Sequence, residues 1–277
     1  MTLSFTYQQP QLLFNPIREQ AFRALQQVLQ NTVGQEDIRE VDLHQQWFTA
    51  MDQCEDLFAD GWYSPPPKGI AVLFGERLHF DSLRNEAFWS GERIMDWARD
   101  SFYAYASPVG RKNGMLGDLS VTLYFGEDQA IRDHIYRCHE ATLEVFHALT
   151  QVQTPAQLLA RAQEIFSDFG LASNVISRTD AAPTNLGHTF PFTDVSEESE
   201  ALSDEAKKTI SQARRFLNEQ AQWSFEPGLQ FTIEPQLIDP RHPELPKVTQ
   251  HYVVQATQEG FIVCNDIDEL LEQYQLI

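Results

Sequence analysis

Phe231-Thr232-Ile233-Glu234-Pro235 is the stretch of sequence that says most about the fold. It lies in a predicted strand, residues 229–238, whose polar residues share one face. These polar residues are Gln230, Thr232, Glu234 and Gln236. A second predicted strand, residues 248–256, carries His251 on a face with Thr249 and Gln255. Core packing does not require an acidic residue or a histidine at such positions, so Glu234 and His251 are candidates for metal binding or acid–base chemistry.

Two further polar residues stand at the edges of predicted strands. Asp118 opens a strand over residues 118–125, in which polar and apolar residues alternate. His188 lies in Gly187-His188-Thr189-Phe190-Pro191, between a glycine and an aromatic–proline corner. A lone carboxylate on a strand is usually only solvated, and a lone histidine is usually a satisfied structural residue. The four candidates gain weight because they occur together in one chain.

Helical periodicity flanks these strands. Apolar residues at spacings of three and four predict helices at 17–29, 130–149, 155–169, 202–216 and 266–276. Two further helices are predicted: one carries Trp47, Met51 and Leu57, and a short one covers residues 94–97. Residues 69–75 and 102–109 predict two more strands. His134, His139 and His147 share one predicted helix at spacings that form no metal pair, so we expect them on the surface. The order of elements predicts an α+β fold with helices on one face of an antiparallel sheet.

Composition limits the function. The chain has 277 residues with 20 Lys+Arg against 40 Asp+Glu, a formal charge of -20. A surface this acidic repels phosphate backbones and anionic lipid. We therefore expect neither a nucleic-acid nor a membrane partner. The sequence predicts a single domain over 1–277 with an insertion at 194–222. The absence of a secretion signal, and three scattered cysteines, predict a cytoplasmic protein.

Four motifs, in order along the chain, resemble those of the pita-bread metallopeptidase family, which includes methionine aminopeptidase, aminopeptidase P, prolidase and creatinase. Residues 231–235 are similar to its F-T-I-E-P strand, and Asn185-Leu186-Gly187-His188 to its G-H metal-histidine motif. Residues 118–126 resemble its D-I-T-R-T-x-x-x-G strand, and residues 251–260 its closing E-x-x-x-x-V-T-x-x-G. The resemblance implies a curved, mainly antiparallel sheet covered by helices, without the extra N-terminal domain of creatinase.

The resemblance also implies a site for two divalent metals, held by two Asp, one His and two Glu. Asp118, His188 and Glu234 match the second Asp, the His and the first Glu. The first Asp position falls on Ser107, or on Tyr105 if the turn is longer by two residues, and we expect both to line the pocket instead. His251 stands at the second Glu position.

Charge compensation then favours one metal over two. Two carboxylates offset one dication, and a second hard cation in a partly dehydrated site would be costly. We therefore expect a mononuclear centre with the ligands Asp118, His188, Glu234 and His251. Imidazole ligands favour Fe, Zn, Mn or Co over Mg. His188 and Glu234 are the expected catalytic residues, with Glu234 as ligand or base.

Three functions stay open at this point. The first is a metal enzyme acting on a small peptide or amino-acid-like substrate, by hydrolysis or, with iron, by oxidation as a non-haem oxygenase. The second is a creatinase-like metal-free hydrolase with His188 as general base and Glu234 gripping a cationic substrate. The third is a pseudoenzyme that binds a peptide or protein partner. We favour the first because His251 keeps a donor atom at a ligand position. Relatives of this fold often pair, which suggests a homodimer.

Overall fold

The structure is a computed structural model that describes residues 4–7, 15–173, 180–195 and 199–277. The chain divides into two compact units. Unit 1 comprises Met1–Leu12, Gln129–Phe190 and Arg215–Ile277, and unit 2 comprises Leu13–Asp128 and Pro191–Arg214. The predicted insertion at 194–222 therefore contributes to both units, and its status as an insertion into a single domain stays a prediction.

Unit 2 is built on an antiparallel sheet in the order β3-β4-β6, with a separate β2-β5 pair. Its helices are α1 (Pro16–Thr32), α2 (Glu40–Asp52) and α5 (Asp204–Ala213). Its strands are β2 (Leu57–Phe58), β3 (Ile70–Phe74), β4 (Ser101–Ala106), β5 (Val109–Gly110) and β6 (Leu119–Tyr124). Short 3-10 turns are η1 (Pro67–Gly69), η2 (Gly75–His79) and η3 (Glu86–Phe88).

Helix α1 begins where its sequence can cap it and packs against α2. The Asn15 side chain accepts the Arg18 N–H at 3.0 Å, and Pro16 occupies the first turn, where its missing N–H costs nothing. The Trp47 indole of α2 donates to the Ala21 carbonyl of α1 at 2.9 Å. Side chains also satisfy the outer edge of β3, because the Phe74 N–H donates to the Glu40 carboxylate at 2.9 Å.

Unit 1 carries a larger sheet system. Its four-stranded sheet has the order β1-β14-β13-β10, and β12-β11-β7 and β8-β9 form smaller ones. Its helices are α3 (Gln129–Ala148), α4 (Pro155–Asp168) and α6 (Asp266–Gln273), with a 3-10 turn η4 (Leu149–Gln151). The first strands are β1 (Ser4–Tyr7), β7 (Ala172–Ser173), β8 (Asn185–His188) and β9 (Phe216–Asn218). The others are β10 (Gln230–Ile233), β11 (Gln236–Ile238), β12 (Val248–Thr249), β13 (Tyr252–Ala256) and β14 (Gly260–Cys264).

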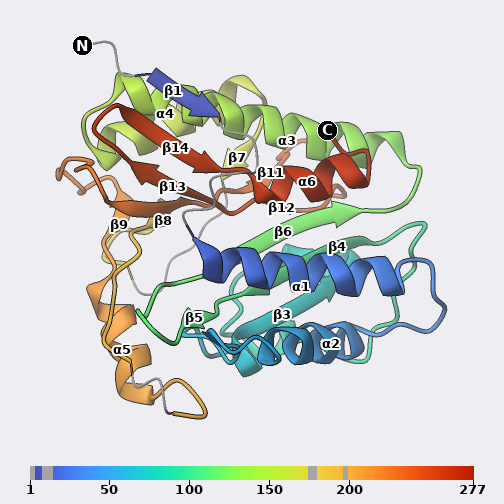
Figure 1. Ribbon diagram of the computed structural model, residues 1–277. Helices are drawn as coiled ribbons and strands as arrows, with labels where there is room; N and C mark the ends of the chain where they lie inside the picture. The colour runs from blue at the N-terminus through green and yellow to red at the C-terminus, as the bar shows by residue number, and fades with distance from the viewer. Residues whose placement is uncertain (1–3, 8–14, 174–179, 196–198) are drawn as a thin grey trace. The chain divides into compact units, whose positions relative to one another are not determined.

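Helices α3 and α6 lie beside the sheet that contains β13 (Figure 1), and both contact Tyr252 of that strand. The Tyr252 hydroxyl lies 3.1 Å from His139 Nδ1 of α3 and donates to Asp268 of α6 at 2.7 Å. The Phe146 ring meets the Tyr252 ring edge-on at 5.0 Å. Because residues on a strand alternate between faces, the neighbouring His251 belongs to the opposite face.

The α+β prediction is confirmed, with a few local corrections. The helix predicted at 94–97 is wrong, because Ile94 pairs with Arg39 in a β-bridge and Met95 donates to the Ile38 carbonyl at 2.8 Å. Helix α2 ends at Asp52, so Leu57 begins a strand instead. The surface prediction holds for His147 but is wrong for His134 and His139, which are buried because they face the sheet and its hairpin loop.

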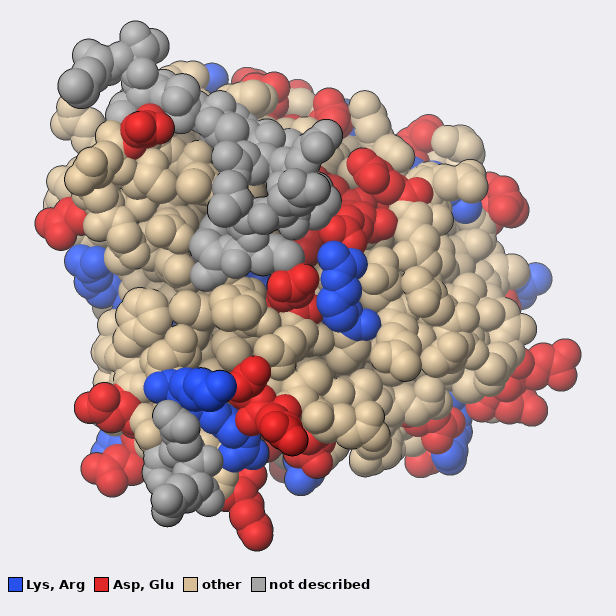
Figure 2. Space-filling model, viewed as in Figure 1, with Lys and Arg blue, Asp and Glu red and all other residues tan. Residues whose placement is uncertain are grey.

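Acidic side chains occur at several separate places on the visible face in Figure 2, in keeping with the formal charge of -20. Within the described part of the chain, no helix is long and apolar enough to cross a membrane.

Candidate functional site

The pairing of two strands places Glu234 directly opposite His251. Ile233 pairs with Tyr252 and Gln236 pairs with Thr249, in one antiparallel register that continues past Pro235. Proline has no N–H to donate, so the ladder is interrupted there and β10 and β11 count as separate strands. Directly opposite residues share a face, and His251 Nδ1 lies 3.4 Å from Glu234 Oε2.

Strand β8 brings His188 to the other side of Glu234. It runs antiparallel to β10, with a bridge between Thr189 and Phe231 and a 2.9 Å bond from the Glu234 N–H to the Leu186 carbonyl. The His188 N–H donates to the Thr232 hydroxyl at 2.9 Å. His188 Nε2 consequently lies 3.9 Å from Glu234 Oε1. The two oxygens of the Glu234 carboxylate therefore face different histidines.

Gly187 makes this approach possible. Its φ is +153°, and a Cβ there would lie 2.2 Å from the Thr232 carbonyl oxygen and 2.4 Å from the Thr232 hydroxyl. No side chain fits so close to a neighbouring strand. The Gly-His dipeptide therefore has a physical purpose: the glycine lets the backbones meet so that the histidine can face Glu234.

Burial and hydrogen bonding fix the chemistry of this triad, defined as His188, Glu234 and His251. The two histidines are 4% and 1% exposed, whereas the Glu234 side chain is 23% exposed. His188 Nδ1 lies 3.1 Å from the Thr189 carbonyl, which can only accept, so Nδ1 carries the proton. In the neutral ring, Nε2 then presents a lone pair toward the Glu234 carboxylate. Two acceptors that face each other favour a proton or a metal cation between them.

Asp118 lies in unit 2, just before β6, and is 1% exposed. The Trp62 indole N–H donates to its Oδ1 at 2.6 Å. The guanidinium of Arg18, itself fully buried, donates to the Asp118 backbone carbonyl. The bond from Trp62 is charge-assisted and holds the carboxylate in place, and the bond from Arg18 holds the backbone.

Tyr105 and Ser107, the two predicted pocket residues, have different surroundings. Burial and the Asp118 carboxylate raise the pKa of the Tyr105 phenol well above its usual value, so it stays neutral at physiological pH. The Ser107 hydroxyl accepts the Tyr63 N–H at 3.2 Å and donates to the Gly69 carbonyl at 3.4 Å. Ser107 Oγ also lies against Gly61 and Gly69, where added Cβ atoms would come within 2.5 and 2.9 Å of it. A larger carboxylate at position 107 would need space that these backbones occupy.

Solved structures of three peptidases share this architecture. An Xaa-Pro dipeptidase from Bacillus anthracis matches with a TM-score of 0.57 and 16% identity over 89% of this chain and 57% of its own. A prolidase from Pyrococcus horikoshii gives 0.59 and 14% over 90% of this chain and 59% of its own. A methionine aminopeptidase from Rickettsia prowazekii gives 0.59 and 10% over 91% of this chain and 96% of its own. All three are pita-bread proteins.

The chain has the pita-bread fold. It spans 57% and 59% of the length of the first two proteins, about three fifths. No family model and no curated protein matches the sequence. The structural likeness supports the fold. Because the identities are 16% or below, the activity must be argued from the residues.

On this pita-bread chain, three of the four predicted ligands meet in unit 1 as the triad, while Asp118 belongs to unit 2. The convergence of all four therefore stays a prediction. As the side chains lie, the described residues include no group of three or more His, Cys, Asp or Glu side chains that could hold a metal ion.

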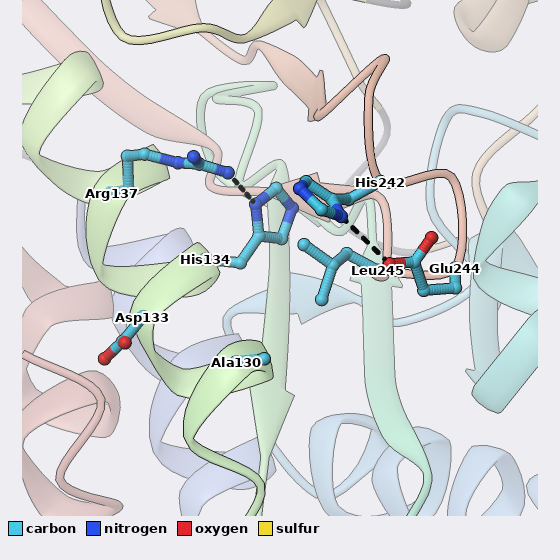
Figure 3. Close-up of a pocket in the computed structure, with 7 residues that line it drawn as sticks. All are labelled: Ala130, Asp133, His134, Arg137, His242, Glu244 and Leu245. Atoms are coloured by element: carbon cyan, nitrogen blue, oxygen red, sulfur yellow. Dashed lines mark hydrogen bonds and ion pairs between the residues drawn. The ribbon is translucent and has the colours of Figure 1, made fainter.

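A pocket of about 220 Å³ lies elsewhere on this pita-bread fold, between the first turns of α3 and the loop after β11 (Figure 3). Its polar groups bond to one another or to nearby protein groups. Arg137 donates to Asp239 at 2.7 Å, His134 Nε2 lies 3.0 Å from the Pro246 carbonyl, and the exposed His242 pairs with Glu244 at 3.1 Å. The pocket contains no predicted site residue, and these contacts tie α3 to the loop.

The sequence gives little sign of two residues near the candidate sites. Trp62 is one of many aromatics, and nothing in its neighbourhood indicates the bond to Asp118. Lys247 is 1% exposed and donates to Gln236 Oε1 at 2.9 Å. The sequence could indicate Lys247 only by its spacing from His251. The two are four residues apart, and an even spacing puts both on one face of a strand.

Replacing Trp62 with phenylalanine tests how firmly Asp118 is held. We expect Trp62→Phe to lower the free energy of unfolding by about 1.5–3 kcal/mol, because a buried carboxylate loses a hydrogen bond. The matched control is Trp97→Phe, which removes a 2.7 Å bond from an exposed indole to the neutral Gln35 carbonyl. Urea denaturation measures both variants. Equal losses in the two variants would contradict the role given to the Trp62–Asp118 bond.

Proposed function

We propose that this chain is a hydrolase with a single divalent metal, and that it cleaves an amide bond in a small peptide-like substrate. His188, Glu234 and His251, all in unit 1, would supply the ligands. The observation that carries the proposal is the pair of contacts at Glu234, where His188 Nε2 and His251 Nδ1 lie 3.9 and 3.4 Å from different carboxylate oxygens. The three similar proteins are all peptidases, which supports an amide substrate.

The donor set fits one small dication. Two imidazole nitrogens with a carboxylate suit zinc, iron, manganese or cobalt. Adjacent ligands about 2.1 Å from a tetrahedral metal lie about 3.4 Å apart, and the two donor spacings in the triad are 3.4 and 3.9 Å. Because the two histidines face different oxygens of Glu234, a single metal requires these side chains to turn toward a common point.

The residues of the triad have separate tasks in this proposal. A bound divalent metal polarises a substrate carbonyl and lowers the pKa of water. His188 is oriented by its Nδ1–H bond to the Thr189 carbonyl, which leaves Nε2 for the metal side. Glu234 has a 23% exposed side chain against 5% and 1% for the two histidines, so it is the member that can reach solvent and exchange a proton as general base.

Metal content tests the proposal. Tag-free protein, analysed by inductively coupled plasma mass spectrometry, should contain about one equivalent of zinc, iron, manganese or cobalt. His251→Ala should lose it, because His188 and Glu234 alone are too few ligands to hold the metal and alanine offers no donor atom in place of the imidazole. The matched control is His147→Ala, which changes an exposed histidine on α3 and should keep the metal. Thermal melting checks that both variants fold.

Other results would contradict the proposal in distinct ways. Two equivalents would indicate a dinuclear centre that includes ligands beyond these three. No metal after reconstitution would leave the metal-free alternatives, in which His188 and Glu234 act as an acid–base pair or the site only binds a partner. One equivalent of iron, by contrast, would agree with the ligand set, and oxidation of a small substrate would then be tested beside hydrolysis.

A further inference from the structure

Gln236 lies two residues beyond Glu234 on the same strand face. Residues Glu234, Gln236 and Ile238 are each partly exposed, whereas Pro235 and Leu237 between them are buried. This alternation, and the pairing of Gln236 with Thr249 two residues from His251, place Gln236 beside the triad on the accessible face.

Lys247 fixes which way the Gln236 amide faces. The lysine is 1% exposed, and its Nζ donates to Gln236 Oε1 at 2.9 Å. A lysine ammonium has donors only, so the oxygen of the amide must face it and the NH₂ group must face away. The buried cation therefore holds a partly exposed amide with its two N–H donors presented outward.

We infer that Gln236, positioned by Lys247, recognises an oxygen of an extended peptide two residues beyond the reacting carbonyl. This inference rests on the proposed function for the place of the reacting carbonyl at the triad. Alternate carbonyls of an extended peptide point the same way about 6.8 Å apart, which is also the spacing of Glu234 and Gln236 along their strand. The oxygen is the C-terminal carboxylate of a tripeptide or a backbone carbonyl of a longer peptide. A dipeptide has no acceptor at this distance, because its carboxylate lies only one residue beyond the reacting carbonyl.

Two comparisons test this inference: peptides of different length, and a variant in which the Gln236 amide becomes a carboxylate. Trialanine and dialanine are titrated calorimetrically into the protein as purified, and chromatography afterwards shows whether the peptides stayed intact. Wild type should bind trialanine about tenfold more tightly than dialanine, the effect of one charge-assisted hydrogen bond.

Gln236→Glu is the sharpest variant. The new carboxylate still accepts from Lys247 but has no N–H donor, so the preference for trialanine over dialanine should vanish. Lys247→Met should weaken the preference by freeing the amide to rotate. The matched control is Gln255→Glu, the same change at a partly exposed position on β13, which should keep the preference. Melting temperatures show that each variant folds.

The outcomes separate this inference from the proposed function. A tenfold preference that survives in Gln236→Glu would overturn the role of Gln236, as would the absence of any preference in wild type. A preference that depends on Gln236 in a protein without metal or peptide cleavage would sustain the recognition of an extended peptide and overturn only the hydrolytic function.

Discussion

Gly187→Ala is expected to unfold unit 1 locally and to release the metal proposed for the triad. The added Cβ would lie 2.2 Å from the Thr232 carbonyl oxygen, and the residue would have to keep a φ of +153°. The backbones of β8 and β10 must then separate, which moves His188 away from Glu234. We expect a loss of at least about 3 kcal/mol in the free energy of unfolding, in the range reserved for severe steric changes. Denaturant unfolding and metal analysis measure the two effects.

The control for this prediction separates a clash from backbone strain. Gly228 has a φ of +92°, and a Cβ there meets nothing within 4 Å. Gly228→Ala should therefore cost only the strain of the conformation, about 1 kcal/mol, and should keep its metal. Similar losses in both variants would mean that the close approach of β8 to β10 does not position His188.

Asp268→Asn is expected to make the protein much more stable in alkaline solution. Burial raises the pKa of Asp268 to about 8 from 3.8. Because the folded state holds this proton more tightly than the unfolded state, the wild type loses stability as the pH rises from about 4 to about 8 and has no more to lose above that range. Asparagine keeps an oxygen for the Tyr252 hydroxyl and has no charge to bury. At pH 9 the variant should gain up to about 5 kcal/mol over wild type.

At pH 4 the two proteins should have similar stability, so the pH dependence identifies the cause. Urea unfolding from pH 4 to pH 9 measures the difference between them, which should grow up to about pH 8 and then level off. Glu144→Gln is the control, because it removes an exposed carboxylate from α3 and should change stability by less than about 0.5 kcal/mol. Parallel curves for wild type and Asp268→Asn would show that Asp268 is ionised in the folded protein.

Much of the fold follows from local patterns in the sequence. The apolar stripe of α3 and the alternation around β6 predict their elements to within a residue or two, although β6 is buried on both faces. The helix predicted at 94–97 fails because tertiary pairing with Arg39 overrides a short apolar cluster. His139 looked like a surface residue because its hydroxyl partner, Tyr252, lies 113 residues away.

The candidate site was predictable only in its residue types. Motif order indicates Glu234, His188 and His251, and strand pairing then brings these three together. The sequence cannot indicate that the hydroxyl of Ser107 is used by the backbone of Tyr63 and Gly69, which leaves no place for the missing aspartate. Nor can it indicate the orientation of Gln236, which depends on a lysine eleven residues away.

The hairpin that joins β11 to β12 has a use in protein engineering. Glu234 and His251 face each other because of the ladder on the strand side of this hairpin, and its loop contributes neither residue. Lengthening a flexible loop costs little, about 0.6 kcal/mol for each doubling. His242 and Glu244 at its tip are exposed, so an affinity tag or fluorophore-binding peptide could be inserted between them without shifting the register. A slip of one residue would turn His251 to the opposite face, so the metal content of an insertion variant would report directly whether the strands kept their alignment.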